Sequence, residues 1–341
     1  MPSVFLSACR REKTPYTPIW LMRQAGRYMK DYKDIREKMS FLDLCKNPEL
    51  AAEVTVTAQE KLGTDAAIIF SDILLILEPL GFAVNYLKKG GPSIVPTLTH
   101  AGSVDKLHDA DPGRSLSFVY KAIRAARKRL KPEIPLIGFA GAPFTLASYM
   151  IEGGPSKNFA STRKFMTGDL PRWNTLMQKI VRPSIAYLNG QIEAGAEAVQ
   201  IFDSWAGILD AKEYEKFVLP HNRGLIQGVT PGVPVIHFST RTGAYLDKVS
   251  EAGGDVIGVD HRIGLDEAWK KIGPDKAIQG NIDPLVLCAD LDELKCHVRR
   301  ILKEASGRPG HIFNLGHGVL PETPVENAIA LVEMVHELSA S

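Results

Sequence analysis

The sequence predicts a single-domain (β/α)8 barrel, an α/β fold in which parallel strands alternate with helices around a closed sheet. Eight short apolar segments rich in β-forming residues recur along the chain, and stretches with helical periodicity separate them. Strands that alternate with helices form parallel βαβ units, and eight such units favour a closed barrel over an open sheet. No linker rich in proline, serine or glycine divides the 341 residues, so residues 1–341 are expected to form one domain.

The predicted elements follow one another in a regular order. The strands are expected at Ile19–Met22, Ala66–Phe70, Leu136–Phe139, Val199–Phe202, Val235–Phe238, Val256–Val259, Ala277–Gln279 and His311–Leu315. Amphipathic stretches at 116–130, 173–193 and 324–338 are expected to be helices. The segment Gly90–Pro96 is expected to leave the barrel after the second strand as a small hairpin.

The charge balance gives no sign of nucleic-acid binding. The chain has 41 basic and 39 acidic residues, a net charge of +2. It has no basic run interleaved with aromatic residues. Any positive field must therefore be local and depend on particular arginines.

The cysteines and the apolar runs indicate a cytoplasmic protein. Cys9, Cys45, Cys288 and Cys296 lie far apart, without a CxxC pair or a histidine at ligand spacing. A disulfide framework and a zinc site are therefore not expected, and a reducing compartment is the simpler interpretation. The N-terminal apolar run is too short for a signal peptide, and no run approaches the length of a membrane span. We expect no membrane partner.

Two arginines follow the first predicted strand. Arg23 and Arg27 come directly after an apolar run and are separated by small residues, including Gly26. At the C-terminal end of a barrel strand, two guanidiniums would present rigid charged donors to an anionic ligand. Gly26 would permit a tight turn or the close approach of that ligand. The alternative is that both arginines are structural and cap helix carbonyls or pair with Asp and Glu.

Other polar residues follow the later predicted strands and converge on the same rim. Asp72 follows the second strand, where it would accept N–H donors and stabilise a developing cation, or simply cap the next helix. His317 lies between two glycines, which leave it open to act as a proton donor or a carboxylate partner. Tyr149 and Ser204 are also at strand ends, although each could be an ordinary packing or turn residue.

The glycines after the last two strands also permit a rival interpretation. Gly280-Asn281 and Gly316-His317-Gly318 lie where barrels of this kind often bind phosphate. Ser204 lacks a GxSxG context, so a nucleophilic serine is not indicated. Histidines and carboxylates are not paired as HxH or HExxH, so a catalytic metal is not indicated either.

Two stretches resemble the signatures of the uroporphyrinogen decarboxylase family. They are Pro18–Arg27 (PIWLMRQAGR) and Gly138–Gly153 (GFAGAPFTLASYMIEG). Four further motifs occur in the family's order: Phe70–Leu74, Phe202–Trp205, Gly280–Pro284 and Asn314–Gly318. The resemblance extends from about Phe5 to the last predicted helix, which is essentially the whole chain.

The resemblance implies a (β/α)8 barrel, usually a homodimer, that uses no metal or organic cofactor. The family converts the four acetate side chains of uroporphyrinogen III to methyls, giving coproporphyrinogen III and carbon dioxide in haem and tetrapyrrole synthesis. Decarboxylation normally needs a cofactor as electron sink. A pyrrole protonated on a ring carbon is its own sink, so the protein must supply a proton donor, a negative group near the pyrrole nitrogens and cationic anchors.

The resemblance also implies roles for particular residues. Asp72 would accept the pyrrole N–H groups and stabilise the cation. Arg23, Arg27 and Arg36 would bind acetate or propionate carboxylates, and one of the first two would be considered as proton donor, although a guanidinium is a poor acid. Candidate catalytic residues are Asp72, Arg23, Tyr149 and His317. The other substrate-binding candidates are the backbone of Gln24, Ala25 and Gly26 together with Ser204, with Phe139, Phe144 and Phe202 as an apolar wall and Tyr32 in a looser part of the pattern.

Three alternatives remain at this point. A related corrinoid or thiol methyltransferase would need a zinc site of His and Cys ligands near the top of the barrel. A tetrapyrrole carrier would bind the same ligand without turnover. A phosphate-binding barrel enzyme would be stabilised by sugar phosphates and would not bind tetrapyrroles.

Overall fold

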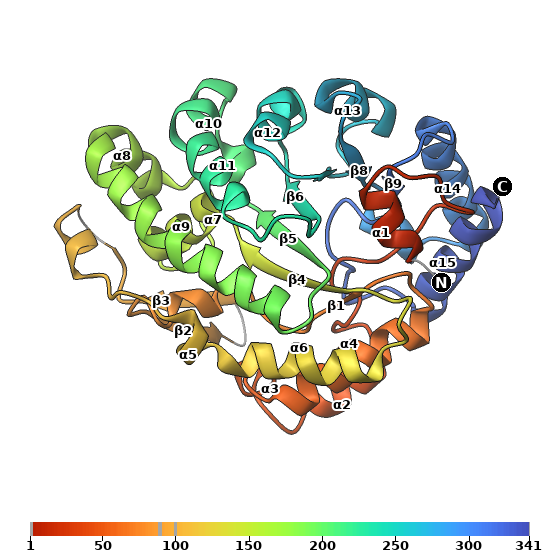
Figure 1. Cartoon of the computed structure of the whole chain (residues 1–341), viewed down its shortest axis with the longest axis horizontal. Coiled ribbons are helices and arrows are strands. Elements are labelled where there is room, and N and C mark those ends of the chain that lie inside the picture. The colour runs from red at the N-terminus through yellow and green to blue at the C-terminus, as the bar shows by residue number, and fades with distance from the viewer. Residues whose placement is uncertain (1–2, 88–90, 99–100, 341) are drawn as a thin grey trace.

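The computed structural model describes residues 3–87, 91–98 and 101–340, and its centre is a parallel seven-stranded sheet that curls around a core (Figure 1). The strands are neighbours in the order β1, β4, β5, β6, β7, β8, β9. Their bounds are β1 (Ala67–Ile68), β4 (Leu136–Gly141), β5 (Ala198–Asp203), β6 (Val235–Ser239), β7 (Val256–Gly258), β8 (Ala277–Gln279) and β9 (His311–Ile312). All seven were predicted, although β1 and β9 are shorter than the apolar runs that contain them.

Helices follow the strands and surround the sheet (Figure 1). They are α1 (Val4–Cys9), α2 (Lys30–Arg36), α3 (Phe41–Cys45), α4 (Pro48–Leu62), α5 (Pro112–Ser115), α6 (Ser117–Arg129), α7 (Pro143–Glu152), α8 (Ala160–Gly168), α9 (Leu170–Glu193), α10 (Ala211–Phe217), α11 (Leu219–Gln227), α12 (Leu246–Ala252), α13 (Leu265–Ile272), α14 (Leu291–Ala305) and α15 (Val325–Ser339). Short 3₁₀ turns are η1 (Leu75–Leu77), η2 (Ala101–Lys106), η3 (Ala206–Ile208), η4 (Gly243–Tyr245) and η5 (Pro284–Cys288). The three predicted helices are confirmed as α6, α9 and α15. Helix α9 begins earlier than predicted because the Asp169 side chain accepts the Arg172 N–H at 3.0 Å and Pro171 suits a first turn.

The first predicted strand, Ile19–Met22, is not a strand of the sheet. Only Ile19 forms an isolated parallel bridge, with Phe313, and its carbonyl accepts the Asp65 N–H at 2.8 Å. The described strands β9 and β1 are therefore not joined by a continuous ladder, and the expected closed barrel is observed as a curled seven-stranded sheet.

Side chains take the place of a ladder along this segment. The Gln24 amide oxygen accepts the Leu21 N–H at 3.2 Å, and the Asn314 amide oxygen accepts the Met22 N–H at 3.0 Å. The Met22 carbonyl accepts the Val319 N–H at 2.9 Å. Because these buried backbone groups already have partners, the segment need not pair as a strand. It reaches the rim of the sheet as an irregular turn.

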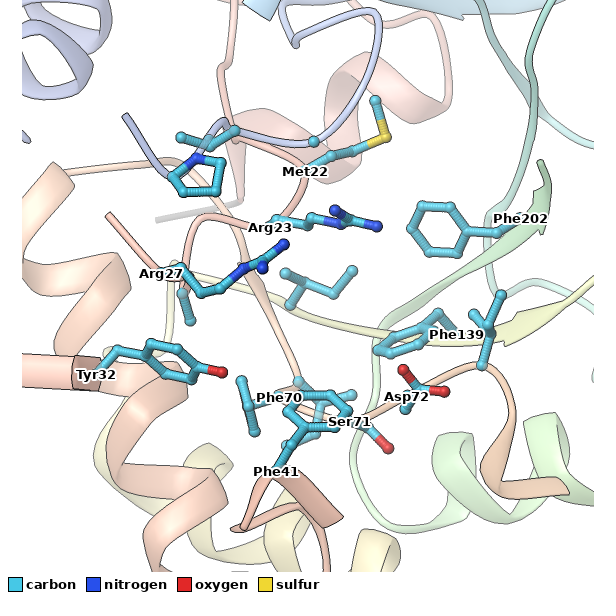
Figure 2. A pocket seen from close by; sticks show the side chains of 18 of the residues that line it. Met22, Arg23, Arg27, Tyr32, Phe41, Phe70, Ser71, Asp72, Phe139 and Phe202 are labelled. Carbon is cyan, nitrogen blue, oxygen red and sulfur yellow. The ribbon is translucent and has the colours of Figure 1, made fainter. Parts of the chain in front are cut away.

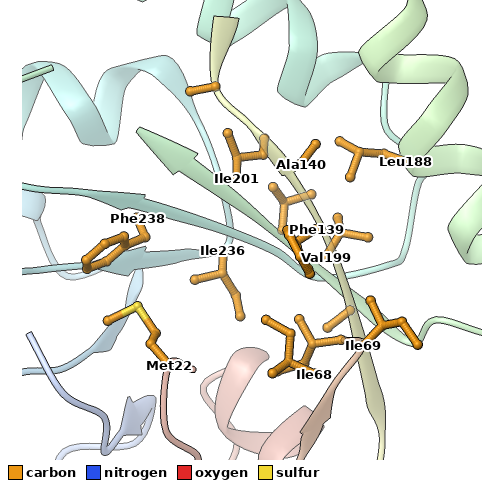
Figure 3. Packing of buried hydrophobic residues seen from close by; sticks show 14 of the residues in the cluster. Met22, Ile68, Ile69, Phe139, Ala140, Leu188, Val199, Ile201, Ile236 and Phe238 are labelled. Carbon is orange, nitrogen blue, oxygen red and sulfur yellow. The ribbon is translucent and has the colours of Figure 1, made fainter. Parts of the chain in front are cut away.

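Interior contacts fix this segment against the sheet. The Trp20 indole N–H donates to the Gln279 amide oxygen at 2.9 Å, and the Gln279 amide donates to Gln200 at 3.0 Å. Side chains from β5, β6 and α9, such as Val199, Ile236 and Leu188, form part of the hydrophobic core (Figure 3). Each fully buried aliphatic side chain stabilises the fold by about 1.5–3 kcal/mol.

A two-stranded hairpin leaves the central sheet after β1. Strands β2 (Ala83–Leu87) and β3 (Gly91–Val95) pair antiparallel, with Ala83 opposite Val95. The predicted hairpin at Gly90–Pro96 is thus confirmed for its second arm, while Gly90 lies outside the described residues. None of the helices in the described ranges is both long and apolar enough to cross a membrane.

Candidate active site

A cavity of about 1110 Å³ opens at the carboxyl ends of the central strands. Its wall combines the turn after Ile19, the ends of β1, β4, β5 and β6, the hairpin and the loop after β9. The lining residues that carry charge or an aromatic ring are Arg23, Arg27, Tyr32, Lys33, Arg36, Glu37, Phe41, Phe70, Asp72, Tyr86, Phe139, Phe202, Phe238 and His317. Backbone and small side chains of Ala25, Gly26, Ser71 and Ser204 complete the wall.

The arginine turn positions two exposed guanidiniums over the cavity (Figure 2). Arg23 has a φ of +63°, a left-handed conformation that few non-glycine residues adopt. The turn is fixed because the Gln24 N–H donates to the Leu21 carbonyl at 2.9 Å and the Tyr28 hydroxyl donates to the Gln24 carbonyl at 2.7 Å. The Arg23 guanidinium forms no hydrogen bond or ion pair with any other residue in the described ranges, so it is free for an anionic ligand.

Glycines leave room for this arrangement. A β-carbon on Gly318 would lie 2.4 Å from Cδ of Arg23, so the arginine side chain crosses directly over that residue. A β-carbon on Gly26 would lie 2.8 Å from the Arg23 carbonyl oxygen. Both positions therefore need glycine for close approach, as the sequence suggested for Gly26.

The other members of the predicted arginine segment differ in their contacts. The Arg36 guanidinium lines the cavity and donates to the Met39 carbonyl, so one of its faces is already occupied. Ala25 lines the cavity beside Arg27. The Gln24 side chain instead turns inward, where its amide donates to the Ala66 carbonyl at 3.2 Å. It holds the turn to the sheet and does not line the cavity.

Asp72 enters the cavity from the end of β1, near Phe139 and Phe202 and across from the two arginines (Figure 2). Its Oδ1 accepts the Leu74 N–H at 2.7 Å, which is the local turn expected from the helix-cap interpretation. Burial raises the pKa of the Asp72 carboxyl, while the Tyr86 hydroxyl, the Leu74 N–H and the charge of Arg23 act in the opposite direction. Capping uses only part of the carboxylate, so the remaining lone pairs are available to donors in the cavity.

Aromatic rings form the apolar wall beside Asp72. Phe139 and Phe202 meet edge to face with centroids 5.6 Å apart, and Phe202 meets Phe238 at 5.9 Å. Phe144, also expected in this wall, is fully buried and packs on Trp173 at 6.1 Å, so it belongs to the core behind the site.

Tyr149, Ser204 and His317 surround the cavity at different depths. Ser204 and His317 line it, whereas Tyr149 is buried behind the wall, with its ring 5.9 Å from that of Trp205. Burial, together with the charge of Asp72, raises the pKa of Tyr149 to about 12, so its hydroxyl keeps its proton. Partial burial and then the neighbouring charge of Arg23 lower the pKa of His317 to about 4, so the imidazole is neutral at pH 7.

The structure adds residues that the sequence reasoning missed. Tyr86 and Phe41 line the cavity from the hairpin and from α3. Neither follows a barrel strand, so the search of strand ends could not find them. Tyr32, whose role was unassigned, lines the same wall and contacts Phe70 with centroids 5.6 Å apart.

Neither the phosphate-binding interpretation nor the zinc-dependent methyltransferase interpretation is supported by the contacts of the residues it depends on. The Asn281 amide donates to the carbonyls of Asp260 and Ile263, at 2.7 and 2.8 Å, so that side chain serves the loop structure and not the cavity wall. Over the described ranges, no group of three or more His, Cys, Asp or Glu side chains is arranged to hold a metal ion. The cavity thus offers two carboxylates, those of Asp72 and Glu37, and several guanidiniums beside aromatic rings, a set that suits an apolar ligand with many carboxylates and N–H donors.

Comparison with known proteins agrees with this chemistry. Residues 2–338 match the family described as uroporphyrinogen decarboxylase (URO-D). The uroporphyrinogen decarboxylase of Carboxydothermus hydrogenoformans is 52% identical over 341 residues, covering 100% of this chain and 97% of that protein. That of Sorangium cellulosum is 49% identical over 335 residues, with 98% and 96% coverage. A solved methyltransferase from Methanosarcina mazei has a TM-score of 0.82, covers 99% of both chains and is 20% identical, a likeness that concerns the fold alone.

Proposed function

This chain belongs to the uroporphyrinogen decarboxylase family, and from that premise we propose that its cavity binds uroporphyrinogen III and converts the acetate side chains to methyls. The family and its relatives make the chain a carboxy-lyase of tetrapyrrole biosynthesis. The products would be coproporphyrinogen III and carbon dioxide. The observation that supports this proposal most strongly is that one cavity holds Asp72 across from the guanidiniums of Arg23 and Arg27, beside aromatic rings.

The reaction needs no cofactor, because the pyrrole ring receives the electrons. A proton added to a ring carbon gives an iminium-like cation. The bond to the carboxylate then breaks, carbon dioxide leaves, and the electron pair forms an exocyclic double bond while the ring nitrogen becomes neutral. A second proton converts that exocyclic carbon to a methyl, and loss of the first restores the aromatic ring. Each acetate therefore consumes one proton and releases one carbon dioxide.

Within this scheme Asp72 accepts the pyrrole N–H groups and stabilises the cation. That role needs the ionised carboxylate, and three features of the site favour this form against burial: the Tyr86 hydroxyl, the Leu74 N–H and the charge of Arg23. A negative charge fixed beside the developing cation is stronger in a cavity from which substrate has displaced water.

Other residues of the cavity hold the substrate. Arg23, Arg27 and Arg36 bind acetate or propionate carboxylates as bidentate partners. The backbone at Ala25 and Gly26, and the Ser204 hydroxyl, add polar contacts. The backbone of Gln24, which was also predicted to bind substrate, already has partners within the turn. The neutral imidazole of His317 is a further donor to carboxylates or to reacting carbons, whereas Tyr149, the other predicted donor, lies buried behind the cavity wall.

The family resemblance also supports four broader proposals. The segment Ile19–Met22 acts as the eighth strand of a (β/α)8 barrel, and the parallel bridge between Ile19 and Phe313 supports this proposal. Residues 1–341 form one domain, and two copies of it form a homodimer whose clefts face each other. The protein works in the cytoplasm. Sedimentation equilibrium at micromolar concentration tests the homodimer, and a monomer that retains full activity would contradict it.

Turnover by the purified, metal-free protein is the direct test. The chain is incubated anaerobically with uroporphyrinogen III, the products are oxidised, and the porphyrins are separated by carboxyl count. Stepwise loss of carboxyl groups to coproporphyrinogen is the expected result. Binding without release of carbon dioxide would make the protein a carrier, and absence of both would overturn the proposal.

A further inference from the structure

Ser204 lines the candidate active site from the turn that follows β5, and a threonine from the end of the neighbouring strand binds that turn. The Thr240 hydroxyl donates to the Ser204 carbonyl at 2.8 Å. We propose that Thr240 is a positioning residue that holds the Ser204 hydroxyl at the cavity wall, where this hydroxyl binds a carboxylate of the substrate. This inference rests on the proposed function, because it assigns Thr240 a task in binding the same substrate.

The pairing of β5 with β6 brings the two residues together, although 36 positions separate them in the sequence. The two strands are parallel neighbours, and the last residue of each, Asp203 and Ser239, are partners in the ladder. Directly beyond this pair, the Thr240 N–H donates to the Asp203 carbonyl at 3.4 Å. The backbone and the side chain of Thr240 therefore both bind the point at which the chain leaves β5 for the cavity.

Thr240 is itself held in place by its surroundings. It is buried, and the next residue, Arg241, turns away from the sheet with a left-handed φ of +59°. The Arg241 N–H donates to the buried Asp260 carboxylate at 2.7 Å. A β-carbon on Gly207 would lie 2.3 Å from the Thr240 carbonyl oxygen, so the chain after β5 packs directly against this backbone. A donor that is fixed on both sides can determine the position of the carbonyl that it binds.

Other hydrogen bonds hold the residues that follow Ser204. The Thr145 hydroxyl accepts the Trp205 N–H at 3.3 Å, and the Tyr245 hydroxyl donates to the Ala206 carbonyl at 2.8 Å. Across the described ranges, the bond from Thr240 is the one that involves Ser204 itself. The Ser204 hydroxyl has no hydrogen-bond partner in that part of the chain, so it is available to a ligand.

An uncharged donor such as the Ser204 hydroxyl depends on its position more than an arginine does. A guanidinium attracts a carboxylate through its charge over several ångströms. A hydroxyl binds a carboxylate only through a short, well-aligned hydrogen bond, which weakens steeply when the donor is displaced or tilted. The contribution of Ser204 to substrate binding should therefore depend on the bond that holds its turn, and Thr240 provides that bond.

The kinetic test removes the Thr240 hydroxyl and keeps the shape of the side chain. Thr240→Val should raise KM about 3–10-fold with a smaller change in kcat, because the hydrogen bond from Ser204 to a substrate carboxylate is weakened. Thr240→Ser keeps the hydroxyl and should restore KM. In a Ser204→Ala background, Thr240→Val should not raise KM further. An unchanged KM, or equal rises in both backgrounds, would overturn the proposal, since Thr240 would then act independently of Ser204.

Ser250→Ala is the matched control, because the Ser250 hydroxyl of α12 also donates to a carbonyl of another element, that of Ile272 at 2.9 Å, and Ser250 does not line the cavity. It should leave KM unchanged. Crystal structures of the variants give a readout that needs no turnover. Ser204 should be displaced from its place at the cavity wall in Thr240→Val and not in Ser250→Ala. An undisplaced Ser204 would refute the positioning role even in an active enzyme, whereas a displaced Ser204 in an inactive protein would refute only the proposed function.

Discussion

Asp72 and Asp203 both lie at carboxyl ends of strands in the same sheet, yet their surroundings differ. Asp203 is fully buried, and both of its oxygens accept bonds from the protein, from the Thr145 hydroxyl at 2.9 Å and the Asn222 amide at 3.0 Å. Asp72 lines the cavity and faces the charge of Arg23. Burial raises the pKa of both carboxyls, that of Asp203 to about 6.

The difference shows how to distinguish a carboxylate with a structural role from one that acts on a ligand. A raised pKa alone does not separate them, because burial gives it to both. The two carboxylates differ in what surrounds their oxygen lone pairs. Those of Asp203 accept bonds from protein donors, whereas Asp72 keeps lone pairs that face the cavity. The four predictions below test this distinction, and they begin with the largest expected effect.

Replacing the cavity carboxylate should have the largest effect. Asp72→Asn should lower turnover by about 10²–10³-fold, because the negative charge beside the developing cation is lost. The midpoint of denaturant unfolding should not fall, since burial disfavours the charge that is removed. Asp34→Asn, an exposed site on α2, is the control and should change neither quantity. Near-normal turnover of Asp72→Asn would leave Asp72 with a structural role like that of Asp203.

Arg23 provides the next test, because it faces Asp72 without pairing with it. Arg23→Ala should lower kcat/KM by about 10²-fold through the loss of bidentate carboxylate binding. Arg11 is a matched control: it is an exposed arginine with a similar left-handed φ of +60°. Arg11→Ala should leave kinetics unchanged. Unaltered kinetics of Arg23→Ala with reduced stability would show that Arg23 is a structural arginine.

Much of this arrangement could be predicted from sequence, because strand and helix periodicity are local properties. The runs that became β4 to β8 combine β-branched residues with turn signals, and the polar residues after them meet at one edge for topological reasons. Asp72 and His317 were found in this way.

The errors came from contacts between residues distant in the sequence. Ile19–Met22 has the composition of a strand, but Asn314, 292 residues away, accepts the Met22 N–H in place of a strand partner. The inward turn of Gln24 depends on the Ala66 carbonyl, which no local pattern specifies. Tyr86 was missed because only the hairpin's pairing and its packing on α7 bring it to the cavity.

The structural role of Asp203 can be measured through the pH dependence of the free energy of unfolding. Its pKa is raised from an unfolded value of about 3.9 to about 6, so the folded state binds the proton more tightly. This carboxyl therefore contributes stability that is fully present below about pH 4 and is lost as the pH rises through about 6, a change of about 2–3 kcal/mol. Asp203→Asn should abolish that change in the free energy of unfolding measured between pH 4 and 7. If the free energy of unfolding of Asp203→Asn still changed between pH 4 and 7, that change would belong to other titratable groups.

Substitution of Gly318 should have the smallest effect, and it tests specifically whether the position of the Arg23 side chain in the cavity governs substrate binding. A β-carbon there would meet Cδ of Arg23 at 2.4 Å, and a flexible side chain can give way to it. Gly318→Ala should therefore raise KM by about 3–10-fold, roughly 1 kcal/mol of binding, with little change in stability. Gly224→Ala in α11, where a β-carbon meets nothing within 4 Å, is the control and should raise stability by about 0.5–1 kcal/mol without affecting KM. If Gly318→Ala left KM unchanged, the position of Arg23 above that glycine would not govern carboxylate binding. The loss expected for Arg23→Ala would then have to come from its charge acting on Asp72.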